Sequence, residues 1–379
     1  MRVGINAYFM LHPDTGSGVY LRNLSRALAS ACDYLELILY VPTGARPPVD
    51  FPNVRLRPVP SASGNLGKLL FEQLGFPLSA LSDGCDVLHV PYFAPAFLGA
   101  NRTVVTVHDV IPALLPAYRP GLLGRAYLVL VSRSVKQARL VLADSAWTKR
   151  DVVQMLGIEQ KSVRVVHLAQ PPECSAPAAS EAVGALRERL GLPESYLLYY
   201  GGFDRRKAVD VLLSAYARVL AARLDVPPLV VAGTLPARTT ETLYDPRPLA
   251  SRLGISQRVH FVGRVTEEDK AALLTSAVLF VYPSIYEGFG LPPLEAMACG
   301  APVIAARTSS IPEVCGSAAL LVRPGDIASL AAAIMGLLDD AALRQELSRR
   351  GRQRASSFSW ERAAADTLLA YESAWKGGP

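Results

Sequence analysis

The chain has 379 residues, half of them hydrophobic, which is enough for two or three domains with substantial cores. Its formal net charge of +6 suits anionic ligands such as nucleotide diphosphates, or an anionic membrane face, and no zinc-finger, RNP or lysine-run pattern points to nucleic acid. The five scattered cysteines lack a CxxC pair, so a disulfide scaffold is not expected. No apolar run approaches about 18 residues and the first residues are typical of a strand, so neither a membrane-spanning helix nor a signal peptide is expected. The protein is therefore expected to be cytoplasmic.

Short apolar and β-branched runs alternate with helical stretches along the chain, and several of these runs are as apolar as strands buried on both faces. The first half is predicted to hold strands at Arg2–Tyr8, Leu35–Val41, Val54–Val59, Asp86–Val90, Thr103–Val107, Arg139–Ala143 and Val163–Val166. The second half is predicted to hold strands at Tyr196–Gly201, Leu229–Gly233, Val259–Val262, Val278–Tyr282, Pro302–Ala305 and Ala319–Val322. Helices such as Leu21–Ser30 and Val211–Ala222 fall between them, so the pattern predicts two successive doubly wound α/β halves.

The domain boundaries follow from composition. Residues 1–170 are predicted to form the first domain and residues 191–359 the second. The stretch 171–190 is rich in Pro, Ala and Ser and is predicted to link them. The last segment, 360–379, contains a predicted helix over Trp360–Trp375.

Candidate ligand-binding residues follow two of the strands predicted in the first half. Gly16 and Gly18 lie where the first strand turns into a helix, and glycines there let backbone N–H groups face a phosphate or sugar; a simple turn is the alternative. His108 and Asp109 end another strand, where open α/β sheets bind ligands, although a lone histidine is more often structural. No full dinucleotide fingerprint is present, which disfavours a nicotinamide dehydrogenase. The histidines show no ligand spacing, so no metal site is expected.

The second half carries cations and carboxylates at the ends of its strands. Arg206 and Lys207 follow its first strand and are suited to neutralise a diphosphate, the alternative being a solvated basic turn. Glu287 lies in a glycine-rich loop after an apolar strand, and Glu295 lies in the first turn of the helix predicted over Pro292–Cys299. The glycines and the helix N-terminus suit a phosphate, and the two carboxylates suit sugar hydroxyls on either side of it. A nucleotide-sugar has this layout of hexose, diphosphate and ribose.

The segments Pro283–Ala305, Thr308–Val314 and Ala318–Asp326 closely resemble the signature of family 4 glycosyltransferases, which are retaining enzymes of the GT-B fold. Within this family, the chain resembles the branch with many bacterial mannosyltransferases of polysaccharide and O-antigen assembly. The resemblance implies two Rossmann-like domains facing an interdomain cleft, with the acceptor surface on the first, the donor on the second, and a C-terminal helix that crosses back to the first. It implies transfer of a hexose from a nucleotide-diphosphate sugar to a saccharide, lipid-linked or small-molecule acceptor, with no cofactor and no metal.

Residue roles carry over from the family motifs. The resemblance implies that His108 orients the donor sugar or stabilises the transition state, that Arg206 and Lys207 clamp the diphosphate, and that Glu287 and Glu295 hold the sugar and the ribose. The catalytic set is thus His108, Glu287, Arg206 and Lys207. The donor-binding set is Gly16, Gly18, Arg206, Lys207, Val265, Glu267, Glu287, Gly288, Phe289, Gly290, Leu291 and Glu295. The arginine that the family often has after the second glycine of the N-terminal loop is Val19 here.

The base and the sugar are predicted from the segment around Val265 and Glu267, which resembles the family segment that lies along the nucleobase. A carboxylate at Glu267 can accept both N–H groups of guanine, and together with the resemblance to the mannosyltransferase branch this favours GDP-mannose as the donor. The competing interpretation is a helix N-terminus with Thr266 as its N-cap and Asp269 at N3.

The stretch Leu122–Leu142 is apolar with interleaved Arg and Lys, which leaves two alternatives: contact with the inner membrane face, or a helix that packs on the sheet with its charges in water. Two other functions share the expected fold. A nucleotide-sugar hydrolase or epimerase would turn over the donor without an acceptor. A non-catalytic nucleotide-sugar-binding protein would keep the clamp but lose the sugar-holding groups.

Overall fold

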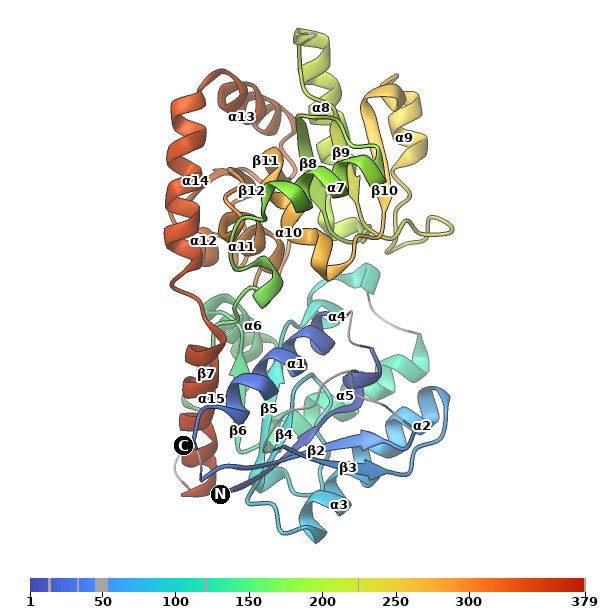
Figure 1. Cartoon of the computed structure of the whole chain (residues 1–379). Helices are drawn as coiled ribbons and strands as arrows, with labels where there is room; N and C mark the ends of the chain where they lie inside the picture. The colour runs from blue at the N-terminus through green and yellow to red at the C-terminus, as the bar shows by residue number, and fades with distance from the viewer. Residues whose placement is uncertain (13–14, 33, 45–53, 119–120, 224, 378–379) are drawn as a thin grey trace. The chain divides into compact units, whose positions relative to one another are not determined.

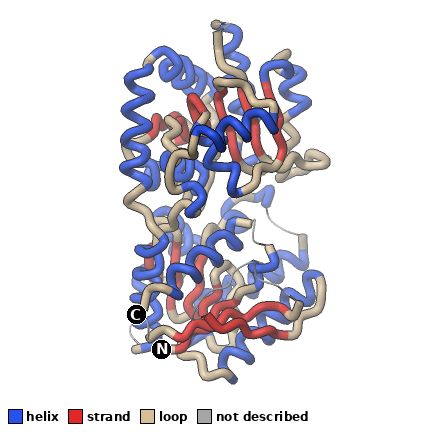
Figure 2. Tube along the Cα trace, in the orientation of Figure 1, coloured by secondary structure: helices blue, strands red, loops and turns tan. Residues whose placement is uncertain are grey.

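The computed structural model describes residues 1–12, 15–32, 34–44, 54–118, 121–223 and 225–377. The chain divides into two compact units (Figure 1): unit 1 is Met1–Leu168 with Ser359–Pro379, and unit 2 is Ala169–Phe358. Figure 2 shows that each unit is built on one sheet with helices packed around it. The two doubly wound halves expected from the alternating pattern are therefore confirmed.

Unit 1 contains a seven-stranded parallel sheet of order β3-β2-β1-β4-β5-β6-β7. Its strands are β1 (Arg2–Asn6), β2 (Glu36–Pro42), β3 (Val54–Val59), β4 (Val87–Val90), β5 (Thr103–Val107), β6 (Leu140–Ala143) and β7 (Val163–Val165). Every residue of β4, β5 and β6 is buried, as their apolar composition predicts for strands covered on both faces.

The helices of unit 1 are α1 (Gly16–Ala29), α2 (Gly64–Leu70), a π-helical turn (Phe71–Gly75), α3 (Phe76–Ser82), α4 (Ile111–Leu114), α5 (Leu122–Gln137), α6 (Ala146–Leu156) and α15 (Trp360–Trp375). Helix α1 begins five residues before the predicted start at Leu21, because the Thr15 side chain caps it by accepting from the Gly18 N–H. Helix α5 ends at Gln137, and the last part of the stretch 122–142 is strand β6.

The C-terminal helix α15 belongs to unit 1, although the whole of unit 2, Ala169–Phe358, separates it in sequence from the rest of that unit. Its Tyr371 side chain is fully buried and the hydroxyl lies 2.7 Å from His89 Nδ1 on β4. Near its start, the Trp360 ring packs 6.1 Å from the Tyr20 ring of α1. The helix α15 therefore packs against strand β4 and helix α1 of unit 1.

Unit 2 contains a six-stranded parallel sheet of order β10-β9-β8-β11-β12-β13. Its strands are β8 (Tyr196–Tyr200), β9 (Leu229–Ala232), β10 (Val259–Gly263), β11 (Ala277–Tyr282), β12 (Val303–Ala306) and β13 (Ala319–Val322). Its helices are α7 (Ser180–Leu190), α8 (Val209–Ala222), α9 (Arg247–Arg252), α10 (Glu267–Thr275), α11 (Leu291–Ala298), α12 (Ile311–Cys315), α13 (Ile327–Asp339) and α14 (Ala341–Ala355). The stretch 171–190, whose composition is typical of a linker, carries α7, which ends at a left-handed Gly191.

The strand order reverses once in each sheet, between β1 and β4 in unit 1 and between β8 and β11 in unit 2. At such a switch point the loops after the two strands part in opposite directions and leave a crevice at the carboxyl ends, where open α/β sheets bind ligands. The loops after β8 and β11 carry Arg206, Lys207 and Glu287, and the loop after β5 beside the other switch carries His108.

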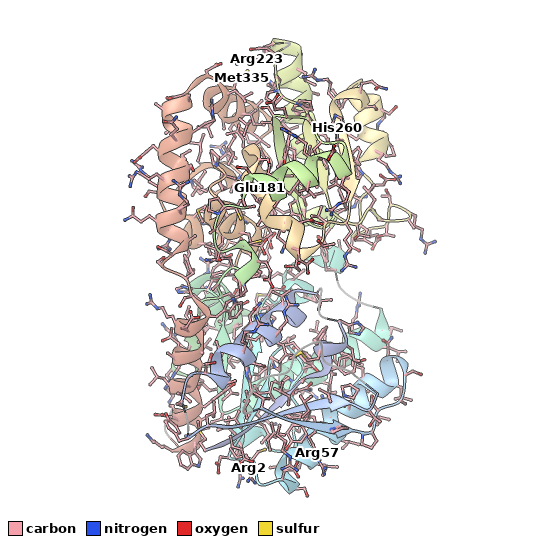
Figure 3. The ribbon with its side chains drawn as sticks, viewed as in Figure 1. Arg2, Arg57, Glu181, Arg223, His260 and Met335 are labelled. Carbon is pink, nitrogen blue, oxygen red and sulfur yellow. The ribbon has the colours of Figure 1, made fainter. Side chains whose placement is uncertain are left out.

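Arg2 and Arg223, which are labelled in Figure 3, both take part in ion pairs. Arg2 pairs with Glu36 at 2.8 Å, and Arg223 pairs with Asp225 at 2.6 Å and also with Asp339. All five cysteines are free thiols, and four of them are buried. Within the described residues, no helix has the length and apolar character needed to cross a membrane.

Candidate active site

The switch point of unit 2 brings Arg206 and Lys207 onto the carboxylate of Glu287. Lys207 Nζ lies 2.7 Å from Glu287 Oε1, and Arg206 Nη1 lies 3.1 Å from Oε2. The hydroxyls of Tyr282 and Ser284 also donate to Oε1, at 2.8 Å and 2.5 Å. The sequence predicted a role for each of these ions, and the structure joins them in one cluster.

Burial and charge set the protonation of this cluster. Burial alone would raise the pKa of Glu287, but Lys207 and Arg206 outweigh it and lower that pKa to about 2. Burial lowers the pKa of Lys207, and the Glu287 carboxylate opposes that change. The Lys207 side chain is only 11% exposed, so the alternative of a solvated basic turn is wrong. Two cations therefore face one carboxylate that is ionised at neutral pH.

Strained backbone supports the cluster on both sides. The Asp204 side chain accepts from the Arg206 N–H and starts the turn Arg205–Lys207, and Ala208 then adopts a left-handed φ of 50°. Ser309, with φ of 48°, accepts from the Glu287 N–H at 2.9 Å. Left-handed backbone at residues other than glycine is uncommon and persists where the surroundings enforce it. Both strained residues adjoin the ion cluster.

The glycine-rich loop enters α11 through Gly290, whose φ is 111°. The positive φ requires glycine here, and a Cβ would also lie 2.7 Å from Ile311 Cδ1, so the end of that side chain would have to move. The helix that follows begins Leu291-Pro292-Pro293, and prolines have no N–H. The N-terminus of α11 therefore offers fewer backbone N–H donors than a helix without prolines would. The backbone N–H groups next to it are those of Phe289, Gly290 and Leu291.

A second ionic cluster lies on α10 and α11, and it contains a residue that sequence reasoning missed. Lys270 Nζ donates to Glu295 Oε1 at 3.0 Å and to Glu267 Oε2 at 2.9 Å. Glu295 and Glu267 are two of the predicted donor-binding residues, and Lys270 joins them. The three-residue spacing of Glu267 and Lys270 on a predicted helix was the available signal.

The helix-cap interpretation of the segment around Glu267 is also correct. Thr266 Oγ1 accepts from the Asp269 N–H at 3.3 Å and donates to the Asp269 carboxylate at 2.7 Å, so α10 begins with a capped first turn. Glu267 occupies the first position of this helix, and Val265 before it is buried. The cap and the ion cluster coexist, because they use different side chains.

In unit 1, His108 lies between two hydrogen-bond acceptors. Its Nδ1 is 2.8 Å from Asp144 Oδ2 and its Nε2 is 3.1 Å from the Pro91 carbonyl oxygen. The Asp144 carboxylate and the Pro91 carbonyl both accept hydrogen bonds, so this geometry suits an imidazole that carries protons on both ring nitrogens. Burial alone would lower the pKa of His108, but the Asp144 carboxylate raises it above the ordinary value. The Tyr20 ring packs edge-on against it at 4.7 Å.

The other predicted residues of unit 1 have local roles. Gly16 and Gly18 form the first turn of α1, and Asp14, which opens that motif in the sequence, lies outside the described residues. Asp109 Oδ1 accepts from the Ile111 N–H at 3.0 Å and so stabilises the start of α4. No cluster of three or more potential metal-ligating His, Cys, Asp or Glu side chains occurs in the described part of the chain.

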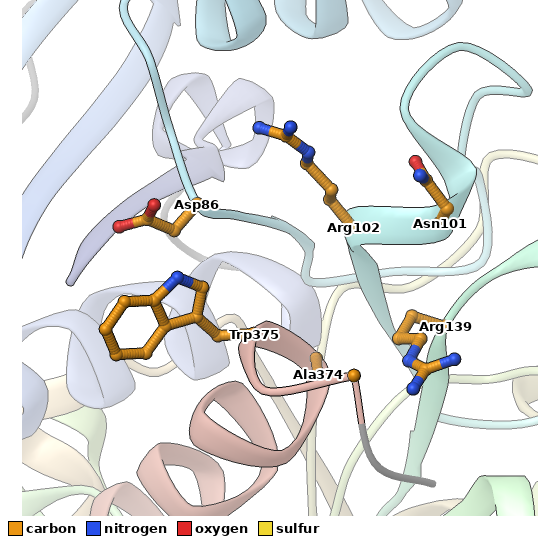
Figure 4. Close-up of a pocket in the computed structure, with 7 residues that line it drawn as sticks. Asp86, Asn101, Arg102, Arg139, Ala374 and Trp375 are labelled. Carbon is orange, nitrogen blue, oxygen red and sulfur yellow. The ribbon is translucent and has the colours of Figure 1, made fainter.

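A cavity of about 460 Å³ lies at the amino ends of the strands of the unit 1 sheet (Figure 4). It is lined by Asp86, Asn101, Arg102, Arg139, Ala374, Trp375 and Gly377. Asp86, Arg102 and Arg139 directly precede β4, β5 and β6, so this cavity faces the amino ends of the strands, whereas His108 follows a carboxyl end. The cavity is therefore separate from the candidate active site.

Comparison with known proteins accounts for both units. Residues 15–169 match the family Glycosyltransferase Family 4, and residues 185–354 match Glycosyl transferases group 1. O-antigen chain mannosyltransferase B of Escherichia coli is 31% identical over 377 residues, which cover 95% of this chain and 97% of that protein. MMP alpha-(1->4)-mannosyltransferase of Mycolicibacterium hassiacum is 31% identical, with 99% and 98% covered.

Solved structures agree on the fold. Sucrose-phosphate synthase (tll1590) from Thermosynechococcus elongatus superimposes with a TM-score of 0.78 at 22% identity and covers the whole of both chains. Two parallel sheets of seven and six strands, each doubly wound, are the GT-B architecture. The chain is thus a GT-B glycosyltransferase that belongs to glycosyltransferase family 4, in the mannosyltransferase-like branch.

Proposed function

We propose that this glycosyltransferase moves a hexose from a nucleotide-diphosphate sugar to a saccharide, lipid-linked or small-molecule acceptor, with retention of the anomeric configuration. The observation that carries the proposal is the cluster of Arg206, Lys207 and Glu287 at the switch point of unit 2. Mannose is the proposed sugar, because relatives at 31% identity over nearly the whole chain are named mannosyltransferases.

The cluster suits the departure of a nucleoside diphosphate. Among the described residues, the Lys207 ammonium donates to Tyr282 and Glu287, which leaves its third N–H for a phosphate oxygen. Lys207 and Arg206 stabilise the charge that grows on the diphosphate as the sugar–phosphate bond breaks. The acceptor hydroxyl attacks the same face of the sugar and passes its proton to the departing phosphate. Glu287 stays ionised and is placed to accept from donor-sugar hydroxyls.

The nucleoside half of the donor is assigned to α10 and α11. Glu295 is proposed to accept from the ribose hydroxyls, and Glu267 from the N1–H and N2–H₂ groups of guanine, which makes GDP-mannose the proposed donor. Unit 1 is proposed to supply the acceptor surface and the cationic His108. No metal takes part in this scheme, because Arg206 and Lys207 supply the positive charge, and transfer is expected to persist in EDTA.

The test is an incubation of the purified protein with GDP-mannose or UDP-glucose, with and without manno-oligosaccharide acceptors. NMR of the product then reads the anomeric configuration. We expect transfer from GDP-mannose, an α-linked product and a larger thermal shift with GDP than with UDP. Release of free sugar at the same rate without an acceptor would instead identify a hydrolase. A β-linked product from the α-linked donor would contradict retention.

We also propose that unit 1 contacts an anionic membrane face through a row of leucines next to α5. Leu66, Leu70, Leu74 and Leu78 are 47% to 68% exposed, and their spacing places them along one helical face. Leu122 and Leu123 at the start of α5 are 85% and 90% exposed. The Tyr127 hydroxyl donates to Glu72 at 2.9 Å, which joins α5 to the leucine-bearing segment.

Charge favours anionic lipid as the occupant of this face. Helix α5 contains Arg125, Arg133 and Lys136 and no acid, and the one acid of 64–82, Glu72, is buried. Exposed leucines flanked by cations bind anionic bilayers by apolar insertion and charge attraction together. The double variant Leu122→Ser, Leu123→Ser should co-sediment less with vesicles that contain phosphatidylglycerol, whereas Leu369→Ser on α15 should not change. Equal sedimentation of wild type with and without vesicles would refute the membrane contact.

A further inference from the structure

We propose that Lys270 is a positioning residue that sets how strongly the protein prefers a ribonucleotide over a 2′-deoxyribonucleotide. It does so by favouring the ionised form of the Glu295 carboxyl group and by holding that group in one orientation. The inference rests on the proposed function, in which Glu295 meets the ribose, and it adds a residue for which the sequence predicted no role.

Lys270 is an unusual lysine, because its side chain is only 4% exposed. It projects from α10 to Glu295 on α11 at 3.0 Å and to Glu267 on its own helix at 2.9 Å. Its ammonium also lies 5.2 Å from the centroid of the Tyr200 ring at the end of β8. Three elements that end or begin at the carboxyl edge of the unit 2 sheet are therefore joined through one nitrogen.

The environment of Glu295 gives the lysine its role. Glu295 is 3% exposed, and burial raises the pKa of its carboxyl group while the Lys270 charge opposes that rise. Among the described residues, Lys270 is the side-chain partner of Glu295, and it takes only Oε1. Burial leaves the pKa of the Glu295 carboxyl group above its ordinary value, and the Lys270 charge limits that rise. Oε2 makes no hydrogen bond to a described side chain and remains an acceptor whose direction is set by the bond at Oε1. In the ionised form that Lys270 favours, a ribose hydroxyl bound there would donate to a charged oxygen, which is the stronger kind of hydrogen bond.

Stability alone does not account for a buried lysine at this position. Apolar side chains of similar volume often replace buried ion pairs without loss of stability, because they avoid the cost of removing charges from water. Helix α10 already packs through Leu273 and Leu274, which are fully buried. An ammonium that faces two carboxylates of the proposed donor site is explained by what it does to those carboxylates.

The experiment measures the affinities of GDP, 2′-deoxy-GDP, UDP and 2′-deoxy-UDP by titration calorimetry. Wild type should prefer the ribonucleotide of the base that it binds by at least about tenfold, the size of one hydrogen bond to a charged group. Lys270→Met should lower this ratio to about one by weakening the ribonucleotide and sparing the deoxyribonucleotide. With the full donor, KM should rise and kcat should change little, because the contact is made before and during the reaction.

Two controls separate positioning from general damage. Leu274→Ala on the same helix should weaken both nucleotides alike and keep the ratio, because it loosens α10 without touching the carboxylates. Lys270→Arg should restore part of the preference, because it returns a cation. If Lys270→Met does not fold, Lys270→Gln replaces it, since glutamine can donate to Glu295 but carries no charge.

The outcomes distinguish this inference from the proposed function. A wild type that prefers ribonucleotides, together with a folded Lys270→Met that keeps the same ratio, overturns the role of Lys270 and leaves the proposed function standing. A wild type that binds neither GDP nor UDP overturns both.

Discussion

At the scale of single residues, the candidate site is a set of buried ions and not a set of independent contacts. Glu287 was expected to hold sugar hydroxyls while Arg206 and Lys207 held phosphate. In the structure, Arg206 and Lys207 both form ion pairs with the Glu287 carboxylate. Removing any one of them changes the surroundings of the others. Effects of these residues on activity and on stability are therefore coupled, as interactions within one network are.

Lys207→Ala should reduce transfer by a factor that corresponds to about 2–4 kcal/mol, the loss found for a single electrostatic donor in a transition state. A solvated lysine would leave the free energy of unfolding unchanged, but Lys207 is 11% exposed against Glu287. We therefore expect a loss of about 3 kcal/mol of stability as well, measured by urea denaturation. Arg205→Ala on the same turn is the matched control. A variant with unchanged stability would show that Arg206 alone suffices for Glu287.

The loss of folding stability at acid pH should depend on the protonation of Glu287. Its pKa is lowered to about 2 in the folded chain, so its contribution is fully present above the ordinary carboxyl pKa of about 4.3 and is lost as pH falls toward about 2. In Glu287→Gln this part of the pH dependence, on the order of 3 kcal/mol, should be absent. Unfolding free energies measured by denaturant titration between about pH 6 and about pH 2 test this prediction. Parallel curves for the two proteins would contradict the assignment.

At the scale of elements, the loops after β8 and β11 are positioned by backbone conformations that few residues tolerate. Ala208 and Ser309 are left-handed, and Gly290 has both a positive φ and a neighbour that a methyl group would strike. The helix α11 that carries Glu295 begins directly after Gly290. The position of one predicted ligand carboxylate thus depends on a glycine with no ligand-binding atom in its side chain.

Gly290→Ala should destabilise unit 2 by about 1–3 kcal/mol, because alanine meets both the strained φ and Ile311. Nucleotide affinity should fall with it, since the start of α11 must shift. Gly336→Ala in α13 is the control: nothing lies within 4 Å of a Cβ there and the residue is helical, so stability should stay or rise by about 0.5–1 kcal/mol. Thermal denaturation and calorimetry read the two effects. An unchanged Tm for Gly290→Ala would show that the loop relaxes freely.

At the scale of the whole molecule, the chain closes unit 1 with its last helix. His89 on β4 is fully buried, and burial lowers its pKa to about 3, so it is neutral. Its two ring nitrogens bond to Tyr371 of α15 at 2.7 Å and to Thr106 of β5 at 2.9 Å. Thr106 in turn bonds to the Tyr20 hydroxyl, whose ring packs on His108. A buried hydrogen-bonded chain therefore runs from the C-terminal helix to the Tyr20 hydroxyl, and the Tyr20 ring contacts the candidate catalytic histidine.

Tyr371→Phe should cost about 1–3 kcal/mol of stability, because it leaves a buried nitrogen of His89 without its partner. Trp375→Phe on the same helix is half-exposed and should change stability little. Urea denaturation followed by tryptophan fluorescence measures both, since Trp147 and Trp360 report on unit 1. Equal midpoints for wild type and Tyr371→Phe would mean that water or a shifted side chain replaces the hydroxyl.

The sequence by itself predicted every strand of the described chain to within two residues at either end, and the two parallel halves with them. Strands buried on both faces are continuous apolar runs, and residues at their carboxyl ends must gather at one edge, so a local pattern is enough to predict them. The same pattern placed Arg206, Lys207 and Glu287 in the loops at the switch point.

The tertiary structure alone decided which of these groups pair and how deeply they are buried. Lys270 meets Glu295 across 25 positions of sequence, and Tyr371 meets His89 across 282. No local pattern encodes such pairs, because they depend on how helices pack over the sheet, and the charge state of each ion depends on the burial that this packing produces. For that reason Lys207 and Arg206 form a buried ion cluster with Glu287. For the same reason Lys270, for which the sequence predicted no role, lies between two carboxylates of the proposed donor site.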